Sequence, residues 1–93
     1  MKPKKYRSVW DALERDPETA ANMKARSELM IAIQERLDRQ AGTQAEKAER
    51  LGVSQPRLND LLRGRIGKFS LDALVNLASR AGLRVALQVR RAA

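Results

Sequence analysis

The spacing of four glycines, Gly42, Gly52, Gly64 and Gly82, most constrains what this chain of 93 residues can fold into. Glycine often ends a helix, because it readily adopts the left-handed backbone conformation that follows the last turn. The glycines therefore divide the chain after Asp16 into one long helical segment and three short ones. We expect helices over residues 17–40, 44–51, 55–63 and 70–81, and residues 9–14 could add one or two helical turns.

Helix-start signals precede each of these segments. A side-chain oxygen at the N-cap accepts a hydrogen bond from an N–H group that the first turn leaves without a partner. Proline fits the first turn, since it lacks the N–H group that would be unpaired there. The predicted N-caps are Asp16, Thr43, Ser54 and Ser70, with Glu46 completing a capping box and with Pro17 and Pro56 in first turns.

The apolar residues repeat every three or four positions, which predicts helices that bury one face in a shared core. The chain holds one Phe, one Tyr and one Trp, so this core must be aliphatic. Ser27 could divide the first helix in two, but we expect one long helix. The predicted core stripes are Ala20, Met23, Leu29, Met30, Ile33 and Leu37 in the first helix, and Leu71, Leu74, Val75, Leu77 and Ala78 in the last.

Residues 83–90 alternate between apolar and polar side chains, which predicts a short β-strand. A lone strand leaves N–H and C=O groups unpaired, and the sequence offers no second strong strand. We therefore expect antiparallel pairing with the same strand of a second copy, with Val85, Leu87 and Val89 as the dimerisation residues. The alternative is pairing with residues 6–10. The predicted organisation is a flexible basic arm over residues 1–8, a helical domain over residues 9–82, and a strand with its tail over residues 83–93.

The formal net charge of +8 is distributed unevenly along the chain. Residues 11–49 hold six Lys and Arg against nine Asp and Glu, whereas residues 50–68 hold five basic residues and one Asp. Clustered positive charge indicates a polyanionic partner, although a solvated basic surface is the alternative.

The sequence has no Cys and no His, which excludes Cys/His zinc sites, thiol nucleophiles and an imidazole base. The carboxylates form no recognisable acid/base arrangement, so we expect no enzymatic activity, no catalytic residues, no metal site and no cofactor. No apolar run approaches the roughly 20 residues of a membrane helix, and no signal peptide is evident. We therefore expect a soluble, cytoplasmic protein that does not contact a membrane.

Residues 44–64, QAEKAERLGVSQPRLNDLLRG, resemble the helix-turn-helix family. Ala48 is small where two helices must approach, Gly52 stands at the turn, and apolar residues follow the spacing of the family. The sequence is similar to the XRE (Cro/repressor-type) class. The long leading helix and the closing strand also look like HigA-like antitoxins and phage-related transcriptional regulators. The resemblance implies an all-α, five-helix repressor-like fold over residues 17–81, with the motif at residues 43–64.

The resemblance further implies a sequence-specific repressor of double-stranded DNA that controls its own operon, with a RelE/HigB-like toxin as a second partner. Two alternatives stay open: a stand-alone phage-type regulator, and a protein whose main role is to neutralise a toxin. The toxin would contact residues 9–30, unless these residues serve only in core packing. RNA binding is disfavoured, because aromatic stacking residues are nearly absent.

The second motif helix is expected to enter the major groove, where Arg suits guanine and Gln or Asn suits adenine. The predicted base contacts are Ser54, Gln55, Arg57 and Asn59; the predicted phosphate contacts are Thr43, Gln44, Arg63, Arg65 and Lys68. Asp60 would contact cytosine or form an ion pair with Arg57 or Arg63. A dimer would require a pseudo-palindromic operator with half-sites about 34 Å apart.

Overall fold

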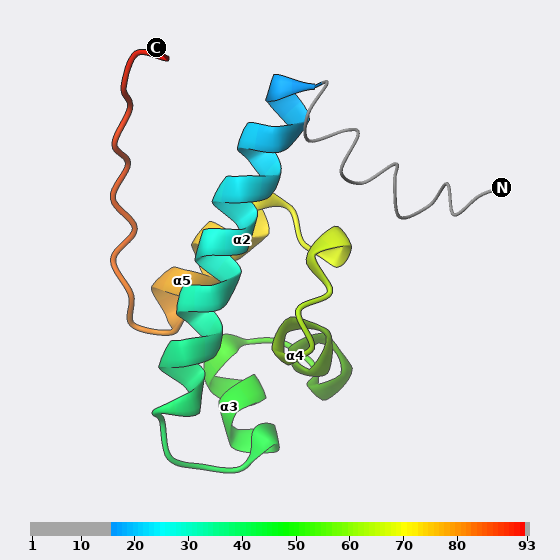
Figure 1. Ribbon diagram of the computed structural model, residues 1–93. Helices are drawn as coiled ribbons and strands as arrows, with labels where there is room; N and C mark the ends of the chain where they lie inside the picture. The colour runs from blue at the N-terminus through cyan, green and yellow to red at the C-terminus, as the bar shows by residue number, and fades with distance from the viewer. Residues whose placement is uncertain (1–15, 93) are drawn as a thin grey trace, which may run out of the picture.

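The computed structural model describes residues 16–92, which form a long helix and a set of shorter elements packed along it (Figure 1). The elements are α2 (Pro17–Asp38), α3 (Gln44–Leu51), α4 (Gln55–Leu62), the 3-10 turn η1 (Ile66–Lys68) and α5 (Leu71–Arg80). None of the helices within residues 16–92 is long and apolar enough to cross a bilayer. The predicted arm over residues 1–8, the helical turns over residues 9–14 and the alternative partner strand over residues 6–10 lie outside the described residues.

The predicted helix starts are confirmed, because each N-cap side chain accepts a hydrogen bond from its own first turn. At α3 the hydroxyl of Thr43 accepts from the N–H of Glu46, and the Glu46 carboxylate accepts from the N–H of Thr43, which completes the capping box. Ser54 and Ser70 accept from N–H groups three residues on, at 3.2 and 3.1 Å. Local sequence therefore fixes where these helices begin.

Asp16 caps the long helix α2. It accepts a hydrogen bond from the Thr19 hydroxyl and another from the N–H of Glu18. Hydrogen bonds from Thr19, and then the one from Glu18, hold the pKa of Asp16 below its ordinary value of 3.8, since they stabilise the charged carboxylate. The first turn of α2 is thus closed by a negative group at the positive end of the helix dipole.

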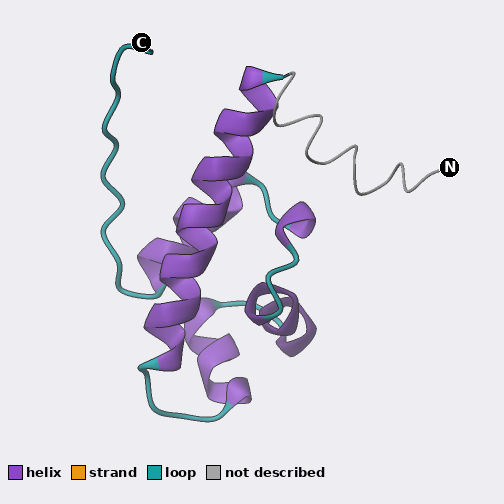
Figure 2. Ribbon diagram, in the orientation of Figure 1, coloured by secondary structure: helices purple, strands orange, loops and turns teal. Residues whose placement is uncertain are grey.

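The helix count and the strand predicted from sequence are both corrected by the structure. Helix α2 continues without a break through Ser27, which confirms the single long helix expected there. The described residues contain four α-helices and one 3-10 turn rather than the five helices that the resemblance implies. Residues 83–92 form an extended segment that belongs to no strand, and Figure 2 draws this segment as loop. The alternation at residues 83–90 is real, but a strand exists only when a second segment pairs with it, and residues 16–92 provide none.

The core lies where α3, α4 and α5 meet α2, and it is aliphatic apart from Phe69. Met30, Ile33 and Leu37 are the buried residues of α2, whereas the more N-terminal apolar residues of that helix are only partly covered or exposed. Val75 was expected in the core but is 36 % exposed. The complete buried set is Met30, Ile33, Leu37, Ala48, Leu51, Leu58, Leu61, Phe69, Leu74, Leu77, Ala78 and Ala81.

Candidate nucleic-acid interface

A tight turn at Gly52 joins α3 to α4. Gly52 has a φ of 71°, and its N–H group donates to the carbonyl of Glu49, while the N–H group of Val53 donates to the carbonyl of Ala48. These two bonds form the paired pattern that closes many helix C-termini. Arg80 of α5 also donates to the carbonyl of Leu51, with its Nη1 atom 3.1 Å away. The angle between α3 and α4 is therefore fixed by backbone bonds and by a side chain from a third helix.

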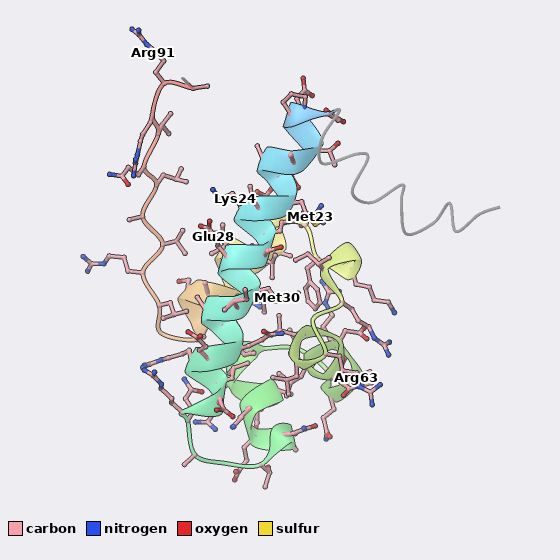
Figure 3. All side chains as sticks on the ribbon, in the orientation of Figure 1. Met23, Lys24, Glu28, Met30, Arg63 and Arg91 are labelled. Carbon is pink, nitrogen blue, oxygen red and sulfur yellow. The ribbon has the colours of Figure 1, made fainter. Side chains whose placement is uncertain are left out.

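Helix α4 buries one side and exposes the other. Leu58 and Leu61 are fully buried in the core. Gln55, Asn59 and Arg63 are spaced by four residues, so their side chains share one row of the helix, in which Gln55 and Arg63 are exposed and Asn59 is partly buried. None of these three side chains forms a hydrogen bond or ion pair with another residue of 16–92, and Figure 3 shows Arg63 on the side of α4 away from α2. We call these three residues the outward row.

Arg57 lies on a different side of α4 from the outward row. Its Nη1 atom donates to the carbonyl of Lys68 at 2.8 Å, and its guanidinium lies 4.0 Å from the centre of the Phe69 ring. A cation over an aromatic face is an attractive contact. Arg57 therefore ties the end of η1 to α4, and a base contact by Arg57 would require these internal contacts to be given up.

Asp60 forms ion pairs, but with partners other than the predicted Arg57 and Arg63. Its carboxylate oxygens lie 3.2 Å from Arg65 and 3.7 Å from Lys68. The chain reverses after α4 at Gly64, and this reversal brings residues 65–68 back beside Asp60. The side chains of Arg65 and Lys68 are still 46 % and 57 % exposed, so both cations remain accessible to an outside anion.

Comparison with known families identifies the family to which the arrangement of α3, the turn and α4 belongs. A family model described as a helix-turn-helix domain matches residues 13–90. The chain belongs to the helix-turn-helix domain family. Comparison with curated proteins gave no match. In a helix-turn-helix domain the second helix of the motif, here α4, is the one that contacts base edges in the major groove of DNA.

The helix-turn-helix domain carries its remaining predicted phosphate contacts at the start of α3. Thr43 and Gln44 are both exposed. The hydroxyl of Thr43 is committed to its cap bond with Glu46, whereas the amide of Gln44 forms no hydrogen bond within residues 16–92. Of these two side chains, Gln44 is the one available to an outside group. The structure thus places predicted contact residues at both ends of the motif, at residues 43–44 and 63–68.

Polar side chains of α2 that were not predicted as contact residues hold the helix-turn-helix unit in place. Gln34 donates to the carbonyl of Leu61, at the end of α4, with a distance of 2.8 Å. Arg26 donates to the carbonyls of Ile66, the first residue of η1, and Phe69, the residue after η1, at 3.3 Å each. The signal was present, because positions 26, 30 and 34 follow one another at four-residue spacing along the core side of α2. Arg26 and Gln34 are polar residues on the core side of a helix, and polar side chains in such positions usually form internal hydrogen bonds.

Proposed function

We propose that this protein is a sequence-specific repressor that binds double-stranded DNA as a homodimer. The observation that carries the proposal is the outward row of α4: the side chains of Gln55, Asn59 and Arg63 form no hydrogen bond or ion pair within residues 16–92, on a helix whose opposite side is buried in the core. A preorganised helix loses little conformational freedom on binding, so its polar groups are available to discriminate between bases. Membership of the helix-turn-helix family supports the same reading.

In the proposed complex the N-terminal part of α4 lies in the major groove. Gln55 and Asn59 suit adenine, and each good bidentate contact would contribute about 1–3 kcal/mol of discrimination. Ser54 is adjacent but already accepts a hydrogen bond from its own helix, so we assign it a secondary role. The phosphate contacts would come from Gln44 and the N-terminus of α3 beside Thr43, and from Arg63, Arg65 and Lys68.

Arg57 takes a different role in this proposal. While its guanidinium stays on Phe69 and the Lys68 carbonyl, it positions residues 65–69, which carry two of the proposed phosphate-binding cations. Arg57→Ala would then weaken binding to all DNA sequences by a similar factor. If Arg57 instead leaves this position to contact guanine, as the sequence alone predicts, Arg57→Ala would relax the preference at one base pair.

We further propose that the protein is an XRE-type autorepressor and the antitoxin of a type II toxin–antitoxin pair, whose partner is a RelE/HigB-like toxin. The resemblance of the leading helix and the C-terminal segment to HigA-like proteins supports this assignment. The outer side of α2 also offers Ile31 and Glu35, both exposed, in a chain whose net charge is positive. This side, and residues 9–15 beyond the described part, would contact the toxin.

The neighbouring reading frame separates the antitoxin from its alternatives. A gene for a small basic protein of about a hundred residues directly beside this one would support a toxin partner. The absence of such a neighbouring gene would favour a stand-alone phage-type regulator. A protein that binds a toxin but has no preference among DNA sequences would be mainly a neutraliser. We propose in every case a binding protein without enzymatic activity or cofactor.

Selection of bound duplexes from a random DNA pool, repeated at two salt concentrations, tests the proposal. We expect an enriched pseudo-palindrome with half-sites about 34 Å apart. Arg65→Ala should lower affinity for every sequence and reduce the slope of log affinity against log salt by about one unit. A pool that stays random after several rounds would refute sequence-specific repression.

A further inference from the structure

An apolar groove lies on the side of the molecule away from α4. It has a volume of about 640 Å³ between α2, α5 and the start of the C-terminal segment. Its apolar lining comes from both helices and from the C-terminal segment of the same chain, which runs along one side of the groove: Ala25, Leu29, Ala32, Leu71, Val75, Ala78, Leu83, Val85, Ala86 and Leu87. Val75 is exposed here, which accounts for the failure of its predicted core position. The groove therefore presents unburied apolar surface beside an extended piece of chain.

The C-terminal segment, residues 83–92, carries apolar side chains that nothing covers within residues 16–92. Leu87 is 91 % exposed and Val89 is 88 % exposed. Beyond Leu83, whose N–H group donates to the carbonyl of Ala78, the backbone groups of residues 84–92 form no backbone hydrogen bond within the described chain. An extended edge with free N–H and C=O groups is a template for pairing with another strand.

We propose that the C-terminal segment of a second copy fills this groove. It pairs antiparallel with residues 83–90 of the first copy, and its Leu87 and Val89 cover the apolar side chains of α2 and α5. The exchange is reciprocal, as a two-fold axis requires. This inference rests on the proposed homodimer and names the surface that receives the partner.

The charges around the groove favour the same chain as the occupant. Glu28 and Asp72 line the groove together with Arg84 of the same chain, and the C-terminal segment of a second copy brings Arg90 and Arg91. Figure 3 shows Glu28 on the side of α2 that faces the segment. A second copy therefore adds cations to a groove that holds two carboxylates and one guanidinium, together with alternating apolar residues and an unpaired backbone edge.

The position of the groove is compatible with DNA binding. Figure 1 shows the C-terminal segment and α4 on opposite sides of α2. Helix α2 contacts α4 through Gln34, whereas Ala25, Leu29 and Ala32 line the groove on another side of the same helix. Pairing at the groove thus leaves the outward row of each copy accessible.

Sedimentation of the full chain across a concentration series tests the interface. We expect the wild type to be a dimer at micromolar concentration. Leu87→Arg and Val75→Arg should raise the dimer dissociation constant at least about tenfold, because each places a charge in the apolar contact. Gln88→Arg and Asn76→Arg introduce the same charge one residue further along the same elements and should change it little. A monomeric wild type, as expected if the segment pairs with residues 6–10, would overturn the inference, and so would an unchanged dimer for Leu87→Arg.

Disulfide trapping provides a second measurement that does not depend on weakened association. The chain has no cysteine, so Leu87→Cys and Val75→Cys can be made separately and mixed under mild oxidation. We expect a covalent heterodimer of the two variants, and Asn76→Cys mixed with Leu87→Cys should give much less. Equal yields from both mixtures would place the contact elsewhere.

DNA binding is measured separately, on a duplex that carries one half-site. Leu87→Arg should still prefer this half-site over random DNA, because α4 is untouched. If the wild type dimerises through the groove but prefers no DNA sequence, the proposed function fails and the interface stands. If Leu87→Arg and the wild type are equally dimeric while both bind the operator, the interface fails and the proposed function stands.

Discussion

The helix-turn-helix unit and the C-terminal segment solve the same problem, the pairing of backbone groups, in opposite ways. In α3 and α4 the helices pair most of their own N–H and C=O groups, and side chains of Gln34, Arg26 and Arg80 take up carbonyls at the turns and helix ends. Residues 84–92 have no such partners within the described chain. The backbone groups of the helix-turn-helix unit are therefore largely paired within a single copy. The C-terminal segment has an alternating apolar and polar sequence but no backbone partner within the described chain.

This difference teaches where function can reside in a chain of this size. A helix that contacts DNA benefits from a backbone that is fixed before DNA arrives, and the backbone of α4 is fixed because its apolar side is buried and its end is bonded to α2. A surface that joins two copies can remain incomplete in each of them. The rigid region therefore suits recognition, and the unpaired region suits assembly.

The largest expected contrast comes from removing one apolar side chain in each region. Leu58→Ala leaves a cavity in the core, so the free energy of unfolding should fall by about 2–5 kcal/mol. Leu87→Ala removes a side chain that one copy leaves exposed, so its effect should depend on protein concentration and vanish where the protein is monomeric. Urea unfolding at several protein concentrations measures both. A concentration-independent loss for Leu87→Ala would contradict the comparison.

The next contrast compares the effects on DNA binding of one exposed glutamine in each region, Gln55 in α4 and Gln88 in the C-terminal segment. Gln55→Ala should cost about 1–3 kcal/mol of preference for the selected operator over a variant with one base pair changed. Gln88→Ala, in the C-terminal segment, should leave this preference unchanged. Competition binding with the two duplexes measures the difference. If the two substitutions had equal effects, Gln55 of α4 would not contribute to base recognition.

The turn between α3 and α4 can be tested at Gly52, whose φ of 71° disfavours any residue with a Cβ atom. Gly52→Ala should lower the free energy of unfolding by about 1–2 kcal/mol. Gly67→Ala is the matched control, since a Cβ atom there meets nothing within 4 Å. Thermal unfolding followed by circular dichroism measures both. If Gly67→Ala proves as damaging as Gly52→Ala, the turn has no special constraint.

The hydrogen bond from Gln34 to the end of α4 should contribute a smaller amount. Gln34→Ala leaves the carbonyl of Leu61 without this donor and should cost about 0.5–1.5 kcal/mol of unfolding free energy. Gln44→Ala removes the same type of side chain from an exposed position and should have almost no effect on stability. Urea unfolding compares the two, and equal losses would mean that the bond does not brace α4.

The smallest effect is expected at the N-cap of α2, which belongs to neither region. The folded-state pKa of Asp16 lies below 3.8, so its charge stabilises the fold above that pH, and this contribution is lost as the pH falls through the folded-state pKa. Asp16→Asn keeps a capping oxygen but no charge. We expect the wild type to melt slightly higher than Asp16→Asn at pH 7 and equally at a pH well below 3.8. A constant difference at all pH values would exclude this linkage.

The sequence by itself determined the helix starts and the turn between α3 and α4. These features depend on interactions within about four residues, such as the bond between Thr43 and Glu46 or the left-handed conformation of Gly52. The candidate row on α4 was also predictable in part, since Gln55 and Asn59 follow from helical spacing once the buried residues are known.

Only the tertiary structure decided which partner each long polar side chain contacts, and whether the extended C-terminal segment has a backbone partner. Arg57 lies on Phe69, Asp60 pairs with Arg65 and Lys68, and Gln34 reaches the end of α4. A flexible side chain can reach several neighbours, and the fold selects one of them. The strand predicted at residues 83–90 failed within the described chain for the same reason, because alternation defines two faces, whereas a strand also needs a second backbone beside it.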